Sequence, residues 1–288
     1  MALLAMTIFV GGAAYCEAQG GPPMRKHTAT TTEPLSLARA NQSAGRNQVS
    51  ITNEGNRRVI AANGIPAHKV GSFPNSGNPH SIEAQNYRFT VSLAPDASSR
   101  ATSNELNLFG VAVNGVPFDP GAAEFWQGNR RSGWQYEALG GAVPLGLDAN
   151  YAHVQPTGAY HYHGLPIGLL QSLGWSSKAA SPLIGYAADG FPIYAITASV
   201  NGRVVEMTSS YRLKSGTRPD GPGGKHDGTF VQDYTYVAGA GSLDECNGAV
   251  VKTAEYPNGT YAYFLTETFP VIPRCHKAKA DSSFSKRR

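Results

Sequence analysis

The 288-residue sequence has little charge, few cysteines and no apolar run of the ~20 residues that a membrane-spanning helix needs. Asp, Glu, Lys and Arg make up only 15% of it, against the ~25% usual for globular chains. Gly (33), Pro (19) and Tyr (14) are frequent. Many turn formers and few charges exclude a helical bundle, and 41% hydrophobic residues exclude a wholly disordered chain. The composition predicts an all-β or β-dominated fold with long loops.

Several sequence motifs are also absent. The chain has no P-loop and no G-x-G-x-x-G before a helix, which removes support for nucleotide binding. It has no G-x-S-x-G, H-E-x-x-H or C-x-x-C either. The net charge of +4 is concentrated near the end of the chain, in Lys277, Lys279, Lys286, Arg287 and Arg288. No basic stripe marks the rest, so we expect no nucleic-acid partner and a solvated basic tail over residues 277–288.

The first 45 residues differ in composition from the rest. Residues 1–18 carry no charge before Glu17 and end in small residues, which predicts a secretory signal peptide and a secreted, periplasmic or extracellular protein. A lipidated Cys16 is the alternative. Residues 19–45 are polar and rich in Pro, Thr and Gly, and we interpret them as a flexible linker. Residues 46–276 show no charge break, which indicates one large domain with no integral membrane segment.

The chain contains three cysteines. If cleavage removes Cys16, the remaining pair, Cys246 and Cys275, suggests one disulfide in an oxidising compartment. Two buried thiols are the alternative.

Two segments of the sequence repeat one pattern. Residues 109–118 (FGVAVNGVPF) and 184–193 (IGYAADGFPI) share apolar-G-x-A-x-[N/D]-G-x-P-apolar. Asn-Gly and Asp-Gly suit the central positions of a type I′ turn, so we predict two similar hairpins. Together with the other short apolar runs, they favour a sandwich-like or barrel-like domain of antiparallel strands.

The stretch Thr157–Pro166 (TGAYHYHGLP) is the densest group of residues that could carry chemistry. In an extended strand His161 and His163 share one face, and Tyr160 and Tyr162 share the other. His153 lies upstream, across a Pro and Gly turn that could bring it to the pair. Three imidazoles with an open position are typical of a copper or zinc site. A structural role for the histidines is the alternative.

This stretch resembles the YHYH-motif family, exported proteins of mostly uncharacterised function. The resemblance also covers LFGVAVNGVPFDPGAAEFW (108–126), SPLIGYAADGFPIY (181–194) and YPNGTYAYFLTETFPVIPRC (256–275). It implies a single exported domain and no particular activity. The family pattern often has His between two later tyrosines, whereas this chain has Ala262 between Tyr261 and Tyr263.

Two carboxylates are candidates for a catalytic role beside the metal. Asp189 occupies the second hairpin turn and Asp148 precedes His153. Either could orient a histidine or act as a general base, although Asp189 also suits turn chemistry. Weaker candidates are a fourth ligand at His226, a calcium site from Asp220, Asp227 and Asp233, and a carboxylate pair at Asp244 and Glu245.

The sequence thus leaves two functional hypotheses. The first is an exported protein that binds copper or zinc through His153, His161 and His163 and uses the metal in hydrolysis of a small-molecule substrate. The second is a non-catalytic extracellular adhesion or glycan- or protein-binding module in which the Tyr/His strand is structural. Imidazole nitrogens within roughly 3–4 Å of one another would favour the first hypothesis.

Overall fold

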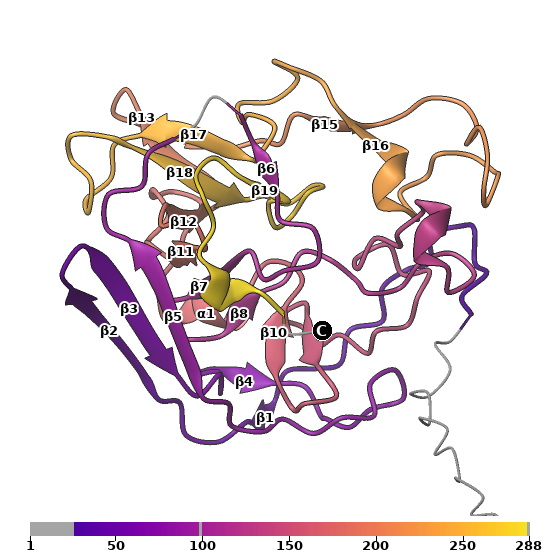
Figure 1. The fold of residues 1–288 in the computed structure, drawn as a ribbon, viewed down its shortest axis with the longest axis horizontal. Helices are drawn as coiled ribbons and strands as arrows, with labels where there is room; N and C mark the ends of the chain where they lie inside the picture. Colours follow the sequence, from indigo (N-terminus) through magenta and orange to yellow (C-terminus); the bar gives the residue numbers. More distant parts are fainter. Residues whose placement is uncertain (1–25, 98–99, 287–288) are drawn as a thin grey trace, which may run out of the picture.

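The computed structural model describes residues 26–97 and 100–286, and short strands dominate these residues (Figure 1). The predicted signal peptide lies outside the described residues. The helical elements are α1 (Ile167–Ser172), η1 (Arg130–Ser132), η2 (Val231–Asp233) and η3 (Ser282–Phe284). The strands are β1 (Gln42–Ser43), β2 (Val49–Glu54), β3 (Arg57–Ala62), β4 (Lys69–Val70), β5 (Tyr87–Ser92), β6 (Thr102–Ser103), β7 (Gly110–Ala112), β8 (Pro117–Phe118), β9 (Ala152–Val154), β10 (Tyr160–Tyr162), β11 (Gly185–Ala187), β12 (Pro192–Ala195), β13 (Thr197–Val200), β14 (Arg203–Glu206), β15 (Tyr211–Leu213), β16 (Tyr234–Tyr236), β17 (Gly248–Val251), β18 (Thr260–Leu265) and β19 (Cys275–His276).

An eight-stranded sheet forms the centre of the molecule, in the order β17-β18-β12-β11-β7-β8-β10-β9. In Figure 1 it extends from β17 and β18 at the top of the view to β10 below. Its hairpins are antiparallel, but β8 with β10 and β12 with β18 are parallel pairs. The β-dominated prediction is confirmed, and the central sheet is open and mixed rather than a closed antiparallel barrel. Parallel pairs arise because long connections carry the chain back to the same end of the sheet.

The two predicted hairpins are present as β7–β8 and β11–β12. Their turns are not of type I′, because Gly115 (φ 81°) and Gly190 (φ 100°) have positive φ but the preceding Asn114 and Asp189 do not. Each Gly N–H instead closes a turn onto the last residue of the first strand, with N–O distances of 2.8 and 2.9 Å. This is a type I turn followed by a left-handed glycine, the usual three-residue hairpin loop.

The main core lies around the central sheet. One cluster of buried side chains surrounds Phe109, Phe118, Tyr160, Tyr162 and Tyr263. A second cluster joins β3 and β5 of the three-stranded sheet β2-β3-β5 to β7 and β11, through Ile60, Phe89, Val91, Val111 and Tyr186. The small sheet therefore packs on the middle of the large one and leaves the β9–β10 end to other segments.

The structure corrects the linker prediction for residues 26–45. The Glu33 N–H donates to Gly140 O at 3.1 Å, Ala38 forms a bridge with Asp148, and β1 pairs with β4. Scattered apolar side chains at Leu35 and Leu37 explain the difference, because they pack on a cluster around Trp134 and Phe230.

The structure also corrects the prediction of a solvated tail for residues 277–286. The Lys277 N–H donates to Asp189 Oδ2 at 3.2 Å, and Phe284 is 1% exposed against Phe89. Lys286 Nζ donates to the buried carboxylate of Asp119. The single aromatic residue of the segment therefore anchors it, and the end of the described chain lies beside β10 (Figure 1).

Cys246 and Cys275 form a disulfide, as the pair of cysteines suggested. The bond joins the turn before β17 to β19 across 29 residues of sequence. A disulfide is consistent with an oxidising, exported environment. Within the described residues no helix has the length and apolar character of a membrane span.

Replacing both cysteines with alanine should lower the free energy of unfolding by about 3 kcal/mol, because a closed loop of this length restricts the unfolded chain. Urea denaturation of the C246A/C275A variant checks this value. The exposed β17 variant Val250→Ala serves as a control and should stay within about 0.5 kcal/mol of the parent. An unchanged midpoint in C246A/C275A would contradict the prediction.

Candidate metal centre

The three predicted histidine ligands lie on the β9–β10 hairpin at one end of the central sheet. His153 and His161 are directly opposite each other in the antiparallel register. His163 follows His161 by two residues and therefore projects from the same face. The turn between the strands contains Gly158, whose φ of 79° requires glycine or a strained residue. Strand alternation and this turn together bring all three imidazoles to one place.

The Nε2 atoms of the three imidazoles converge. His161 Nε2 lies 3.0 Å from His163 Nε2, which lies 3.1 Å from His153 Nε2. Nitrogens of the three side chains all lie within 4.8 Å of one another, so they could hold one metal ion. Two of the three nitrogen pairs therefore meet the separation of roughly 3–4 Å that favours a metal site over a structural role.

Backbone carbonyls orient two of the rings. His153 Nδ1 lies 2.8 Å from Leu145 O, and His161 Nδ1 lies 3.1 Å from Ala159 O. The carbonyl makes the shorter of two contacts to His153 Nδ1, the other being the Asn78 amide nitrogen at 3.2 Å. A carbonyl only accepts, so each Nδ1 carries the proton and each Nε2 presents a lone pair. This arrangement of the distal nitrogen is the one found around metal-bound histidines.

Burial keeps the three imidazoles neutral. His161 and His163 are 2% and 4% exposed, and His153 is partly exposed. Desolvation, followed by the charge of a neighbouring imidazole for His153 and of Lys286 for His161, lowers the pKa of both residues from 6.5 to about 3. Desolvation also holds the pKa of His163 well below 6.5. Neutral imidazole is the form that binds metals, so the cluster has ligating nitrogens across the physiological pH range.

Acid should destabilise the metal-free protein before its carboxylates titrate. The folded pKa of His161 is about 3 and its ordinary value is 6.5, so below pH 6.5 the unfolded chain binds a proton that the folded chain excludes. Stability is therefore full above pH 6.5 and falls as the pH drops toward 3, by about 2 kcal/mol at pH 5 from His161 alone. Urea denaturation at pH 7 and pH 5 measures the difference.

The variant H153Q/H161Q is the matched control, because glutamine does not titrate. Its loss of stability between pH 7 and pH 5 should be clearly smaller than that of the parent. Equal losses in the two proteins would show that these histidines do not cause the pH dependence.

A carboxylate that the sequence analysis missed lies beside the cluster. Asp119 follows β8, its N–H donates to Tyr162 O at 2.9 Å, and its Oδ2 lies 3.9 Å from His161 Nε2. The side chain is 1% exposed and Lys286 donates to it. Desolvation raises the pKa of Asp119, and the Lys286 ammonium opposes that shift. No local pattern indicates this residue, because the parallel pairing of β8 with β10 brings it to the site.

The two carboxylates that the sequence suggested as catalytic, Asp148 and Asp189, form hydrogen bonds away from the histidine cluster. Asp148 accepts from Tyr160 Oη at 2.8 Å and from the Gly71 N–H at 2.9 Å. Asp189 accepts from Tyr263 Oη at 2.5 Å and from backbone N–H groups of the C-terminal segment. Both are buried and both join distant segments. Among the described contacts, neither carboxylate meets the three histidines.

The weaker candidates also have other partners. His226 Nδ1 lies 3.2 Å from Ser215 O, and the histidine is not part of the cluster. Asp227 and Asp233 form ion pairs with Arg218, and Asp220 accepts from the Trp134 indole. Asp244 and Glu245 face Lys277. These contacts account for the acidic side chains without calcium.

The tyrosines of the motif point to the opposite face of the strand, as predicted. Tyr160 Oη donates to Asp148, and Tyr162 Oη accepts from Asn114 Nδ2 at 2.9 Å. His68 Nε2 lies 2.6 Å from Tyr162 Oη. Both phenol rings are fully buried in the main core. The tyrosines of the tetrapeptide therefore pack in the core, and its histidines face the candidate metal site.

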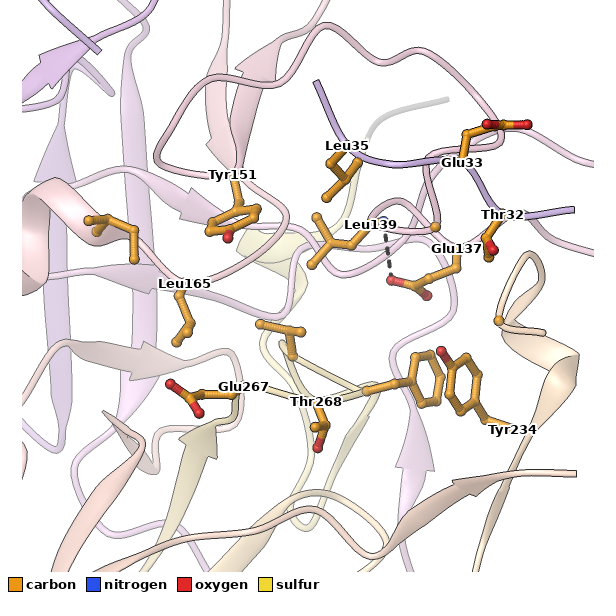
Figure 2. A pocket seen from close by; sticks show the side chains of 15 residues that line it. Thr32, Glu33, Leu35, Glu137, Leu139, Tyr151, Leu165, Tyr234, Glu267 and Thr268 are labelled. Carbon is orange, nitrogen blue, oxygen red and sulfur yellow. Dashed lines mark hydrogen bonds between the residues drawn. The ribbon is translucent and has the colours of Figure 1, made fainter. Parts of the chain in front are cut away.

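A cavity of about 740 Å³ lies near this end of the sheet. Figure 2 shows Tyr151 and Leu165 on one side of it and Glu137 and Tyr234 on the other. The backbone of Tyr151 accepts the His163 N–H at 2.7 Å, so one wall of the cavity is hydrogen-bonded to the motif strand. The three histidines do not line the cavity.

A family model described as YHYH protein matches residues 88–278, more than half of the chain. The matched range contains the three histidines, Asp119 and both cysteines of the disulfide. No curated protein and no solved structure matches the chain.

Proposed function

The chain belongs to the YHYH protein family, and we propose that it is an exported protein that binds one copper or zinc ion through His153, His161 and His163. Metal binding is assigned here from the geometry of the imidazoles, since the family description names no ligand.

One observation carries the proposal: three Nε2 atoms converge, and the neutral imidazoles have too few protons to join all of them by hydrogen bonds. The carbonyl contacts leave His153 and His161 with Nε2 lone pairs, and His163 Nε2 lies 3.0 and 3.1 Å from these two nitrogens. Besides His163, His161 Nε2 meets the Gln155 amide nitrogen, at the longer distance of 3.4 Å. A neutral His163 has one proton, which can bridge one of these contacts and leaves lone pairs opposed in the other. His163 Nδ1 is itself buried without a hydrogen-bond partner among the described residues. A single cation satisfies all three lone pairs at once.

The spacing also suits a small transition metal. Metal–nitrogen bonds of about 2.0–2.1 Å at a tetrahedral angle put neighbouring nitrogens about 3.3 Å apart. The observed 3.0 and 3.1 Å are close to that separation. Three neutral imidazoles favour copper or zinc over magnesium or calcium, which prefer oxygen ligands.

Metal-assisted hydrolysis is the chemistry that such a centre would support. Three histidine ligands leave one coordination position open, and a metal held by them would lower the pKa of a water bound in that position and would polarise a substrate oxygen. The carboxylate nearest to the cluster among the described contacts is Asp119, whose Oδ2 lies 3.9 Å from His161 Nε2 and accepts from Lys286, and this carboxylate would accept a proton there. We assign the general-base role to it in preference to Asp148 and Asp189, whose oxygens hold tyrosine hydroxyls and backbone N–H groups.

We propose a secreted, periplasmic or extracellular location, supported by the disulfide and by the apolar first 18 residues. The partner is then an extracellular ligand or small-molecule substrate. The described surface offers no argument for a nucleic-acid partner.

Elemental analysis of the untagged protein tests the metal proposal. We expect close to one equivalent of copper or zinc per chain, lost on chelation and regained when the metal is returned. Cobalt substitution should add visible bands of a nitrogen-ligated, low-coordinate ion. A folded protein that holds neither metal, before or after reconstitution, would refute the proposal.

The 740 Å³ cavity favours a second candidate, a glycan-binding module. Its volume is in the range of small-molecule sites, and Tyr234, Tyr151 and the carboxylates of Glu33 and Glu267 offer stacking and acceptor groups for sugar hydroxyls. Binding of glycans to a Tyr234→Ala variant should then be weaker than to the parent. Glycan binding that is unaffected by Y234A, or none in the parent, would remove this candidate.

A further inference from the structure

The order of the central sheet is symmetric about its middle. From the antiparallel pair β7–β11 outward, each half contains an antiparallel strand (β8 or β12), a parallel strand (β10 or β18) and an antiparallel edge strand (β9 or β17). Both halves follow the same path, with the hairpin first and the outer strands after a long connection. We call β7–β10 the first half and β11, β12, β17 and β18 the second half.

The strand registers of the two halves coincide. The repeated sequence pattern aligns Phe118 with Ile193. Phe118 is paired with Tyr162, and Ile193 is paired with Tyr263. This equates Tyr160-His161-Tyr162-His163 with Tyr261-Ala262-Tyr263-Phe264. In the next pairing His161 is opposite His153, and Ala262 is opposite Ala249.

Side-chain hydrogen bonds repeat as well. Tyr160 Oη donates to Asp148, and Tyr261 Oη donates to Asp244. Tyr162 Oη bonds to Asn114 of the first hairpin turn, and Tyr263 Oη bonds to Asp189 of the second. Each tyrosine pair therefore has the same two anchors in its own half.

The backbone turns before the edge strands match too. Tyr151 and Asn247 are non-glycine residues with φ of 51° and 52°. The His163 N–H donates to Tyr151 O at 2.7 Å, and the Phe264 N–H donates to Asn247 O at 2.9 Å. Left-handed backbone at a non-glycine residue is uncommon, so its recurrence at equivalent positions argues against coincidence.

We infer that the second half is a copy of the metal-binding scaffold in which the three ligand positions are occupied by Ala249, Ala262 and Phe264. The inference rests on the proposed function of the first half for what the scaffold binds. The second half would then be a metal-site scaffold without ligands, and it should bind a transition metal if histidines are placed at these three positions.

The surroundings of these positions fit a vacated site. Ala262 is 0% exposed and Phe264 is 1% exposed, in an apolar cluster with Tyr194, Ala198 and Met207. The same alignment equates Tyr194, within β12, with Asp119, so the second half lacks the carboxylate as well as the imidazoles. A cavity of about 520 Å³ lined by Tyr194 and Phe264 leaves room beside position 264.

The full-length variant A249H/A262H/F264H tests the inference by metal stoichiometry. We expect it to bind one equivalent of zinc or cobalt more than the parent protein measured in parallel. The matched control is V250H/A262H/F264H, which moves one imidazole to the opposite face of β17, where Val250 is 78% exposed. This control should gain no tightly bound equivalent.

Each outcome is decisive. A folded triple variant with no more metal than the parent overturns the inference. If the triple variant does not fold, A249H/A262H is used instead: a second, weaker equivalent supports the inference, and a folded double variant without one overturns it. Failure of both to fold also overturns it, because a retained scaffold must accept its ligands. A parent without metal and a triple variant with one equivalent would refute the proposed function and still support the copied scaffold.

Discussion

Replacing His161 with alanine is expected to weaken the binding of copper or zinc at least about 100-fold. His161 is at the centre of the hairpin, opposite His153 and 3.0 Å from His163 Nε2. The H161A variant keeps two imidazole ligands. It also lacks the His161 Nε2 lone pair, which faces His163 Nε2 in the metal-free protein. Changes to groups that only support a ligand already weaken binding about 10–100-fold, so removing the ligand itself should cost at least about 100-fold in affinity.

Metal-dependent stabilisation is the sharpest measurement of this effect. A metal at 100 times its Kd raises the free energy of unfolding by about 2.7 kcal/mol. The parent should therefore melt at a higher temperature with zinc or copper than without it, whereas H161A should gain no more than about 0.4 kcal/mol at the same concentration. Titration calorimetry on both proteins gives the affinities directly.

His226→Ala is the matched control, because this imidazole lies outside the cluster and contacts only a backbone carbonyl among the described residues. It should keep the affinity of the parent. An H161A protein that is folded and binds copper or zinc as tightly as the parent would show that the converging imidazoles are not the site.

Replacing Arg218 with methionine is expected to cost about 3–5 kcal/mol of stability, the effect of leaving a buried charge without its partner. Arg218 donates to both oxygens of Asp233, each at 2.7 Å, and its Nη2 also donates to Asp227 at 2.7 Å. The side chains of Arg218 and Asp233 are both 0% exposed. Arg218 Nη1 also donates to Thr30 O at 2.9 Å, so the same guanidinium holds the N-terminal segment.

Urea denaturation of R218M measures this loss. Arg203→Met, on the exposed strand β14, removes the same charge from the surface and should change stability by less than about 0.5 kcal/mol. The double variant R218M/D233N removes both buried charges and should recover part of the loss. An R218M protein within about 1 kcal/mol of the parent would contradict the importance of this ion pair.

The shared face of His161 and His163 in the candidate metal centre could be predicted, because the alternation of side chains along a strand is a local property. Two residues separated by one in a strand share a face whatever the rest of the fold does. The position of His153 also followed from the Pro and Gly turn between the two segments. Asp119 could not be found in this way, since it reaches the cluster through the parallel pairing of β8 with β10, which depends on the path of the whole chain.

The hairpins illustrate the same limit at smaller scale. The sequence located both turns correctly but assigned the wrong turn type, because Asn-Gly fits two loop lengths that differ only in which residue starts the turn. The sequence also did not indicate the partners of Asp148 and Asp189. Their carboxylates are needed by tyrosine hydroxyls of other strands, and no local pattern shows that a buried phenol across the sheet requires an acceptor.

The contact between Lys286 and Asp119 has a consequence for how the protein is made. Residue 286 leaves the ribosome, and in an exported chain the translocation channel, long after the histidine hairpin and Asp119, so the folding chain has these side chains before it has this ammonium group. Until Lys286 docks, the Asp119 carboxylate beside the imidazoles lacks this ion pair. The site then attracts cations more strongly than it does in the complete fold. The proposed metal ion would therefore bind most favourably before the C-terminal segment docks, and the docking of Lys286 would then balance the charge of Asp119.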